Sequence, residues 1–166
     1  MHDIGTLLVE LHDAETALAD EFRAVAERQA ADPGTHHPCH TLARQCDDHA
    51  ARVRAAAGRH ATGIPGPHQP RGVTGAVETA RHWGAGLIGR HQHHPGLRLL
   101  RDLGRLYLTA TAVDLHWILL GQTAQAVRDA GLLAECAPLH RETRTQLAWI
   151  STRLKEAAPQ VLATGG

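Results

Sequence analysis

The chain has 166 residues, a length that predicts one domain (1–166) whose core needs no disulfide or metal to fold. Its 17 basic and 17 acidic residues cancel at neutral pH, so no net charge points to nucleic acid or an anionic membrane as a partner. Three cysteines, the absence of a signal-peptide pattern and the lack of an apolar run near the roughly 20 residues of a membrane span predict a cytoplasmic protein. The unusual feature is a count of 14 histidines, because histidine is the commonest protein metal ligand.

Apolar residues at steps of three and four predict a first helix from about Ile4 that ends at Asp32-Pro33-Gly34. Its expected inward face consists of Ile4, Leu7, Leu8, Leu11, Glu15, Leu18, Phe22 and Val25. A second helix is expected from Pro38, a favourable first-turn residue, to about Gly58. Its inward face would carry Leu42, Cys46, His49 and Val53. Each of these two faces therefore combines apolar residues with candidate ligands.

The middle of the chain, 58–96, is rich in Gly, Pro and His and is too long for a plain loop in a compact domain. Within it, apolar residues from Val73 to Ile88 predict a short amphipathic helix. We interpret 58–96 as a crossover with a helical segment inside it. The histidines of this crossover and of the first inter-helix turn are expected to be solvated loop residues: His36, His37, His40, His91, His93 and His94.

A third helix is expected from Leu97 to about Ala130, and it has two apolar stripes. The main stripe consists of Leu99, Leu103, Leu106, Ala110, Val113, Trp117, Leu120, Ala124 and Val127. The second stripe consists of Leu108, Ala112, Leu115 and Leu119. A helix that is apolar on two sides must be covered on both, either by the crossover or by a second subunit. We predict a homodimer through this helix.

After a tight turn at Gly131, a fourth helix is expected to end near Pro159. Its inward face would consist of Leu132, Cys136, Leu139, Thr143, Leu147, Ile150 and Leu154. No segment has the pattern of a strand. The sequence therefore predicts an all-α fold, a four-helix bundle of two helical hairpins with one long crossover between them, which is the layout of ferritin-like bundles.

Two Cys/His doublets lie on inward faces, Cys46 with His49 and Cys136 with His140. The helix before each doublet carries a carboxylate, Glu15 in the first hairpin and Asp114 in the second. Bundles build metal sites from such inward side chains, so these six residues are predicted to converge on a metal ion. Thiolate with imidazole suits zinc or copper, whereas carboxylate-rich sites suit iron, and the choice among the three stays open.

Four segments resemble the ferritin-like superfamily, and more closely a set of small actinobacterial ferritin-like proteins of unassigned function. They are HDAETALADEFRAVAERQ, TLARQCDDHAARV, LGRLYLTATAVDLHWILLGQTAQAVRDAGLL and LAWISTRLKEAAPQVL, about two thirds of the chain. The resemblance implies a metal-binding protein, with oxidoreductase activity as a further expectation. It places Glu15 and Asp114 at the single carboxylates of the di-iron pattern and His49 and His140 near its two histidines.

This chain departs from the di-iron pattern at both doublets. Cys46 stands three residues before His49, where the pattern has a bridging glutamate, and Cys136 precedes His140 by four. Asp47, Asp48 and Glu142 flank these positions but point about 100° or more away from the inward faces of ideal helices. These departures argue against a carboxylate-bridged di-iron centre and leave a softer donor set of thiols, imidazoles and carboxylates.

Each candidate ligand also has a structural interpretation without metal. The cysteines fit an inert core, because cysteine is among the most buried residue types. Glu15 with His49, and Asp114 with His140, would then be hydrogen-bonded pairs, since buried polar groups usually have partners. Under that interpretation the protein is a bundle that binds a small apolar or partly charged molecule between its helices, or a homodimeric interaction module without metal.

Overall fold

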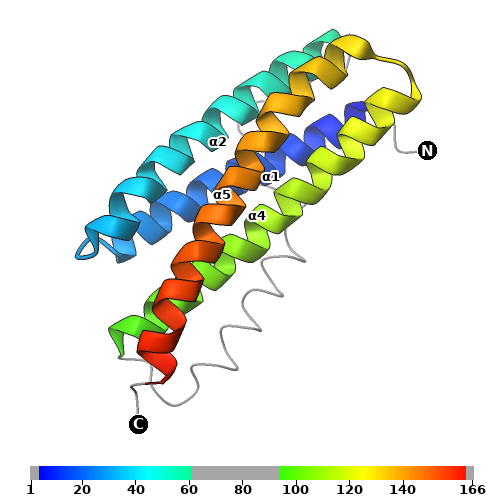
Figure 1. Ribbon diagram of the computed structural model, residues 1–166. Coiled ribbons are helices and arrows are strands. Elements are labelled where there is room, and N and C mark those ends of the chain that lie inside the picture. Colours follow the sequence, from blue (N-terminus) through cyan, green and yellow to red (C-terminus); the bar gives the residue numbers. More distant parts are fainter. Residues whose placement is uncertain (1–3, 61–93, 164–166) are drawn as a thin grey trace.

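The computed structural model describes residues 4–60 and 94–163, which form long helices arranged as a bundle (Figure 1). The helices are α1 (Ile4–Arg28), α2 (Pro33–Arg59), α4 (Pro95–Ala126) and α5 (Ala130–Leu162). No strand occurs in these two ranges, which confirms the predicted all-α class. The short helix predicted between Val73 and Ile88 lies outside the described residues.

Helix α2 begins at Pro33, five residues before the predicted start at Pro38. The cause is Asp32, whose side chain accepts hydrogen bonds from the backbone N–H of Gly34 at 3.0 Å and from the hydroxyl of Thr35 at 2.7 Å. An Asp cap followed by Pro at the first helical position is a strong start signal. The segment that the sequence analysis assigned to the end of the first helix therefore opens the second, and Pro38 lies inside it.

The second hairpin turns at 127–129 and not at Gly131. Arg128 adopts a left-handed backbone conformation (φ 59°), and Asp129 caps α5 by accepting a hydrogen bond from the N–H of Leu132 at 2.9 Å. Gly131 is consequently the second residue of α5. The helix also continues past Pro159 to Leu162, where the sequence predicted an end.

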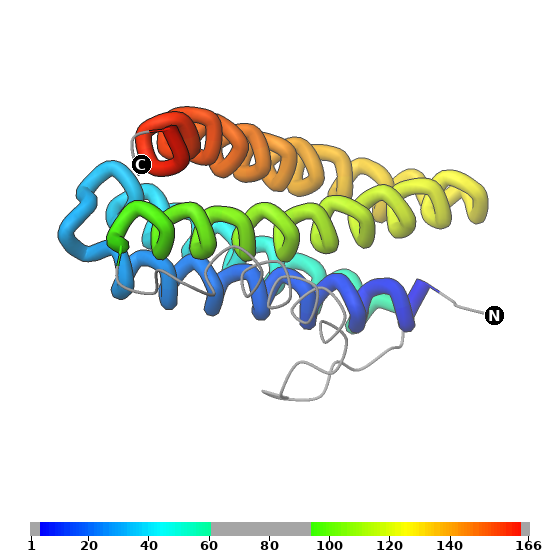
Figure 2. The backbone as a smooth tube through the Cα atoms, turned by 90° about the horizontal axis from the view of Figure 1, so that it is seen from below, coloured from blue at the N-terminus to red at the C-terminus, as the bar shows by residue number. Residues whose placement is uncertain are grey.

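The helices pack by their apolar faces, with α1 against α2, α4 against α1, and α5 against α4 (Figure 2). On α1 the predicted inward face is buried as expected, apart from Ile4, which is partly buried. The main stripe of α4 is also largely buried, but Val127 is 58% exposed because the helix has already ended there. Removal of these apolar surfaces from water supplies the main driving force for the bundle.

Of the four pairs of neighbouring helices, α2 and α5 approach each other least closely, and polar side chains bridge the gap between them. We call this set of contacts the α2–α5 seam. Its members are Asp32 with Arg153 (3.0 Å), Gln45 with Gln146 (2.8 Å), His49 with Glu142 (2.9 Å) and Arg59 with Glu135. On this side of the bundle hydrogen bonds and ion pairs are the main contacts, whereas on the other sides they accompany extensive apolar packing.

The second apolar stripe of α4 is partly accessible to solvent. Leu115 is 53% exposed and Leu119 is 43% exposed, whereas Leu108 and Ala112 are half-buried. No helix in the described ranges is both long enough and apolar enough to cross a membrane.

Candidate functional site

The buried carboxylate of Glu15 is the innermost polar group of the bundle. Its side chain is fully buried on α1, and Oε1 accepts hydrogen bonds from the indole Nε1 of Trp117 at 2.7 Å and from Nδ1 of His49 at 3.0 Å. The rings of Trp117 and His49 meet edge to face, with centroids 6.1 Å apart. Helices α1, α2 and α4 thus each contribute one side chain to this contact. The predicted pairing of Glu15 with His49 is present.

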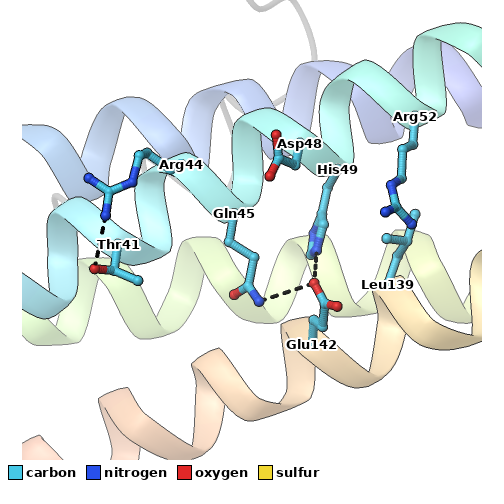
Figure 3. A pocket seen from close by; sticks show the side chains of 8 residues that line it. All are labelled: Thr41, Arg44, Gln45, Asp48, His49, Arg52, Leu139 and Glu142. Carbon is cyan, nitrogen blue, oxygen red and sulfur yellow. Dashed lines mark hydrogen bonds and ion pairs between the residues drawn. The ribbon is translucent and has the colours of Figure 1, made fainter.

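His49 has a second carboxylate partner on its other ring nitrogen. Nε2 lies 2.9 Å from Oε2 of Glu142 on α5, and Gln45 donates a hydrogen bond to the same oxygen at 3.0 Å (Figure 3). The His49 side chain is 1% exposed, whereas that of Glu142 is 47% exposed. His49 therefore connects a carboxylate at the surface to a carboxylate in the core.

The two carboxylates decide the charge of His49. Burial by itself lowers the pKa of an imidazole, but hydrogen bonds and charge attraction from Glu15 and then from Glu142 outweigh it, so the pKa of His49 is raised. A protonated ring donates from both nitrogens, which matches a carboxylate at each one. The arrangement is a Glu–His–Glu triad of Glu15, His49 and Glu142.

Glu142 was missed by the sequence analysis because an ideal α5 directs it away from the inward face. Glu142 reaches His49 because α5 and α2 are widely spaced, which leaves room for a long side chain between the two helices. Gln146 could not be predicted as a member of this network either, because a glutamine side chain is not among the usual metal ligands of carboxylate, imidazole and thiolate type. It is fully buried one turn later and donates to Gln45 at 2.8 Å.

Cys46 lies within this network as a protonated thiol. Its Sγ donates to Oε1 of Gln146 at 3.7 Å, and burial together with the negative charge of Glu15 raises its pKa. Cys136 is buried on α5, where burial and the charge of Glu135 raise its pKa to about 11. Both cysteines are neutral at physiological pH and behave as core residues in this arrangement.

Asp114 and His140 form a separate pair at the edge of the bundle. Oδ1 of Asp114 lies 2.8 Å from Nε2 of His140, and the two side chains are 22% and 26% exposed. In the described ranges, no hydrogen bond links this pair to Glu15 or His49. The structure therefore distributes the six predicted ligands over two carboxylate–imidazole pairs and two buried thiols.

A metal centre built from all six residues does not fit this distribution. As the side chains are placed in 4–60 and 94–163, no three His, Cys, Asp or Glu residues surround a common metal position. Both ring nitrogens of His49 face carboxylates, and the thiol of Cys46 is hydrogen-bonded to Gln146. A smaller donor set of His49 Nε2 and Glu142 is compatible with a metal ion, because Glu15 holds the other ring nitrogen as the outer carboxylate does in many metal sites.

A solvent-open cavity of about 350 Å³ lies between α2 and α5, directly outside this network (Figure 3). It is lined by Thr41, Arg44, Gln45, Asp48, His49, Arg52, Leu139 and Glu142. By contrast, the space beside Trp117 and Cys136 in the apolar interior measures only about 10 Å³, roughly one water molecule or less. Of these two spaces, only the cavity between α2 and α5 has room for a small molecule.

Two arginines of the cavity lining have no acidic partner among residues 4–60 and 94–163. Arg44 forms a hydrogen bond with the hydroxyl of Thr41 at 3.3 Å, and neither Arg44 nor Arg52 lies within 4.0 Å of a carboxylate of the described residues. Asp48 stands between them on α2, and Glu142 is already held by His49 and Gln45. The lining therefore contains two guanidinium groups and one carboxylate, Asp48, that has no hydrogen-bond partner among the described residues.

No protein-family model, curated protein or solved structure matches this chain. The resemblance to ferritin-like proteins remains a prediction from the residues quoted above.

Proposed function

We propose that this protein binds a small organic anion in the cavity between α2 and α5. The observation that carries the proposal is the pair of cavity-lining arginines, Arg44 and Arg52, which pair with no carboxylate in the part of the chain that the structure describes. A guanidinium group presents several N–H donors in a planar fork that matches a carboxylate or phosphate. The ligand would supply the acidic group that the described residues do not.

The remaining lining supports this choice of ligand. The cavity volume of about 350 Å³ lies in the range of small-molecule sites. The hydroxyl of Thr41 and the amide of Gln45 add uncharged polar groups, and Leu139 adds an apolar surface. Because the lining is mainly polar, the structure favours the partly charged ligand over the apolar one among the alternatives left open by the sequence.

Calorimetric titration at constant ionic strength tests the proposal with succinate, citrate and inorganic phosphate as probes and uncharged succinamide as the control ligand. We expect at least one anion to bind and succinamide not to bind. A charge-assisted hydrogen bond contributes about 1.5–3 kcal/mol, so Arg44→Gln and Arg52→Gln should each weaken binding about tenfold or more.

Arg54→Gln is the matched control, because Arg54 is an exposed arginine of α2 that contacts His12 and does not line the cavity. It should leave the anion affinity unchanged. If none of the three anions binds, or if Arg54→Gln weakens binding as much as Arg52→Gln, the cavity is not an anion site.

A second candidate function is metal binding in a ferritin-like bundle, which we infer from the carboxylate–imidazole pair at the core. Glu15 accepts from Nδ1 of His49, and its other oxygen, Oε2, is buried without a hydrogen-bond partner. His49 and Glu142 would hold zinc or iron, both of which accept nitrogen and oxygen donors. This donor set suits copper(I) less well, because copper(I) prefers thiolate ligands. A bound ion of this kind supplies a Lewis acid or, for iron, a redox centre.

Metal analysis of the chelated and reloaded protein separates this candidate from the first. His49→Ala should lower the bound metal, whereas His140→Ala, which removes an imidazole from the separate pair with Asp114, should leave it unchanged. Equal metal content in the wild type and the His49→Ala variant would exclude this site.

We also propose a homodimer through α4 and a ferritin-like connection between the two hairpins. The dimer is supported by the exposed side chains of Tyr107, Leu115, Ile118 and Leu119 on one helix. From Leu106 to Ala126 the helix carries one acidic residue, Asp114, and no Lys or Arg, so two copies would meet with little charge repulsion.

A cytoplasmic location is supported by three cysteines that are buried and unpaired.

A further inference from the structure

Three histidines expected in a loop belong instead to the first turns of α2. Since α2 begins at Pro33, His36, His37 and His40 are helical. His36 and His40 are four residues apart and therefore lie on the same side of the helix. Their ring centroids are 4.7 Å apart, with the ring planes nearly perpendicular. The helix start thus pairs two imidazoles that the sequence alone left unpaired.

The tautomer of His36 is fixed by a backbone contact. Its Nδ1 lies 2.9 Å from the carbonyl oxygen of Ala26 in α1, and a carbonyl oxygen only accepts hydrogen bonds. Nδ1 must therefore carry the hydrogen, which leaves the lone pair of the neutral ring on Nε2. Histidine ligands of metal ions usually have this arrangement, with one nitrogen donating to a carbonyl or carboxylate and the other binding the metal.

A carboxylate of α1 lies beside the second ring. Oε1 of Glu27 is 3.7 Å from Nε2 of His40, and the Glu27 side chain is 75% exposed. Two donors that share a zinc ion lie roughly 3.4 Å apart when each is about 2.1 Å from the metal in a tetrahedral site. The side chains of His40 and Glu27 are solvent-accessible, so they are free to rotate, and the ring of His40 already lies beside that of His36.

We propose that His36 Nε2, His40 and Glu27 bind a divalent transition-metal ion at the turn between α1 and α2. Two imidazoles and one carboxylate suit zinc, with water in the remaining position. Since Glu27 belongs to α1 and the histidines to α2, the ion would join the end of one helix to the start of the next. This site is separate from the anion cavity and from the triad of Glu15, His49 and Glu142.

Zinc titration of the metal-stripped full chain by calorimetry tests the site. We expect one equivalent of zinc whose affinity falls at least tenfold in His40→Ala and in His36→Ala, and several-fold in Glu27→Gln. His37→Ala is the matched control. The ring of His37 also meets that of His36 edge to face, with centroids 5.0 Å apart, but among the described residues no carboxylate lies within 4.0 Å of it. His36→Ala also removes the hydrogen bond to the carbonyl oxygen of Ala26 and could therefore lower stability by itself. His40→Ala leaves that hydrogen bond intact, so a loss of zinc affinity in this variant does not arise from misfolding.

Thermal unfolding with and without zinc gives a second readout. Zinc should raise the Tm of the wild type and of His37→Ala, and it should raise the Tm of His40→Ala much less. His49→Ala should leave this response unchanged, which distinguishes the turn site from a metal ion at the core. Wild-type zinc affinity in both His36→Ala and His40→Ala, or an equal loss in His37→Ala, would overturn the proposal.

Discussion

Replacing Glu15 by leucine isolates the energetic role of the buried triad. Leucine has a similar volume, so the main loss is the acceptor for the indole N–H of Trp117 and for Nδ1 of His49. An unsatisfied buried donor costs about 1–3 kcal/mol, and removing one partner of a buried ion pair costs about 3–5 kcal/mol. We expect the free energy of unfolding to fall by about 3–5 kcal/mol.

Two further variants separate charge from hydrogen bonding. Glu15→Gln keeps an acceptor oxygen and removes the negative charge, so it should cost only about 1–2 kcal/mol. The double variant Glu15→Leu, His49→Leu removes both members of the buried pair and should be more stable than Glu15→Leu alone, because an apolar pair leaves no buried charge without a partner. Adding the second single variant, His49→Leu, completes a double-mutant cycle that gives the coupling energy of the pair.

Urea unfolding followed by circular dichroism gives the three free energies, and thermal scans provide an independent check. At about 2–4 °C per kcal/mol for a domain of this size, Glu15→Leu should lower the Tm by roughly 6–20 °C. A loss below about 1 kcal/mol for Glu15→Leu, or a double variant less stable than that single variant, would show that the buried triad does not stabilise the bundle as described.

Three other predictions concern pH, thiols and assembly. Because the pKa of His49 is raised above its ordinary value of 6.5, its contribution to stability is fully present below pH 6.5 and is lost as pH rises through the raised pKa. The difference in unfolding free energy between the wild type and His49→Leu should therefore be larger at pH 6 than at pH 9. An equal difference at the two pH values would contradict the raised pKa. The three buried cysteines should react with a thiol reagent at pH 8 only after unfolding, and rapid labelling of the native protein would show that they are accessible. Sedimentation should show a dimer for the wild type and a monomer for Leu115→Glu, Leu119→Glu; a wild-type monomer or a dimeric variant would exclude the α4 interface.

The helices and most of the core could be predicted from the sequence because apolar residues recur at the helical period. On α1 the pattern from Leu7 to Val25 is continuous, and its single buried charge, Glu15, needed a partner, which made His49 a reasonable choice. Helix ends were less certain. Pro38 gave a plausible start for α2, but Asp32 followed by Pro33 supplied a better cap.

The composition of the site could not be predicted from helix faces alone. The pattern of apolar residues identifies the inward face of each helix but not the distance between two helices. In the structure, α2 and α5 lie farther apart along the α2–α5 seam than the other neighbouring helices do. That separation lets Glu142 reach His49 from a position off the inward face. It also accounts for His140, whose imidazole pairs with Asp114 at the bundle edge and is not directed toward His49.

The polar character of the α2–α5 seam has a consequence for the motions of the bundle. Water can replace hydrogen bonds and exposed ion pairs at little net free energy, whereas separating apolar faces exposes hydrocarbon surface. Opening between α2 and α5 is therefore the least costly way to loosen this bundle while α1 stays packed against α4. Such an opening widens the route to the cavity and exposes Gln146 and Cys46 to solvent, so amide hydrogens of α5 should exchange faster along the seam than those of α1 in the core.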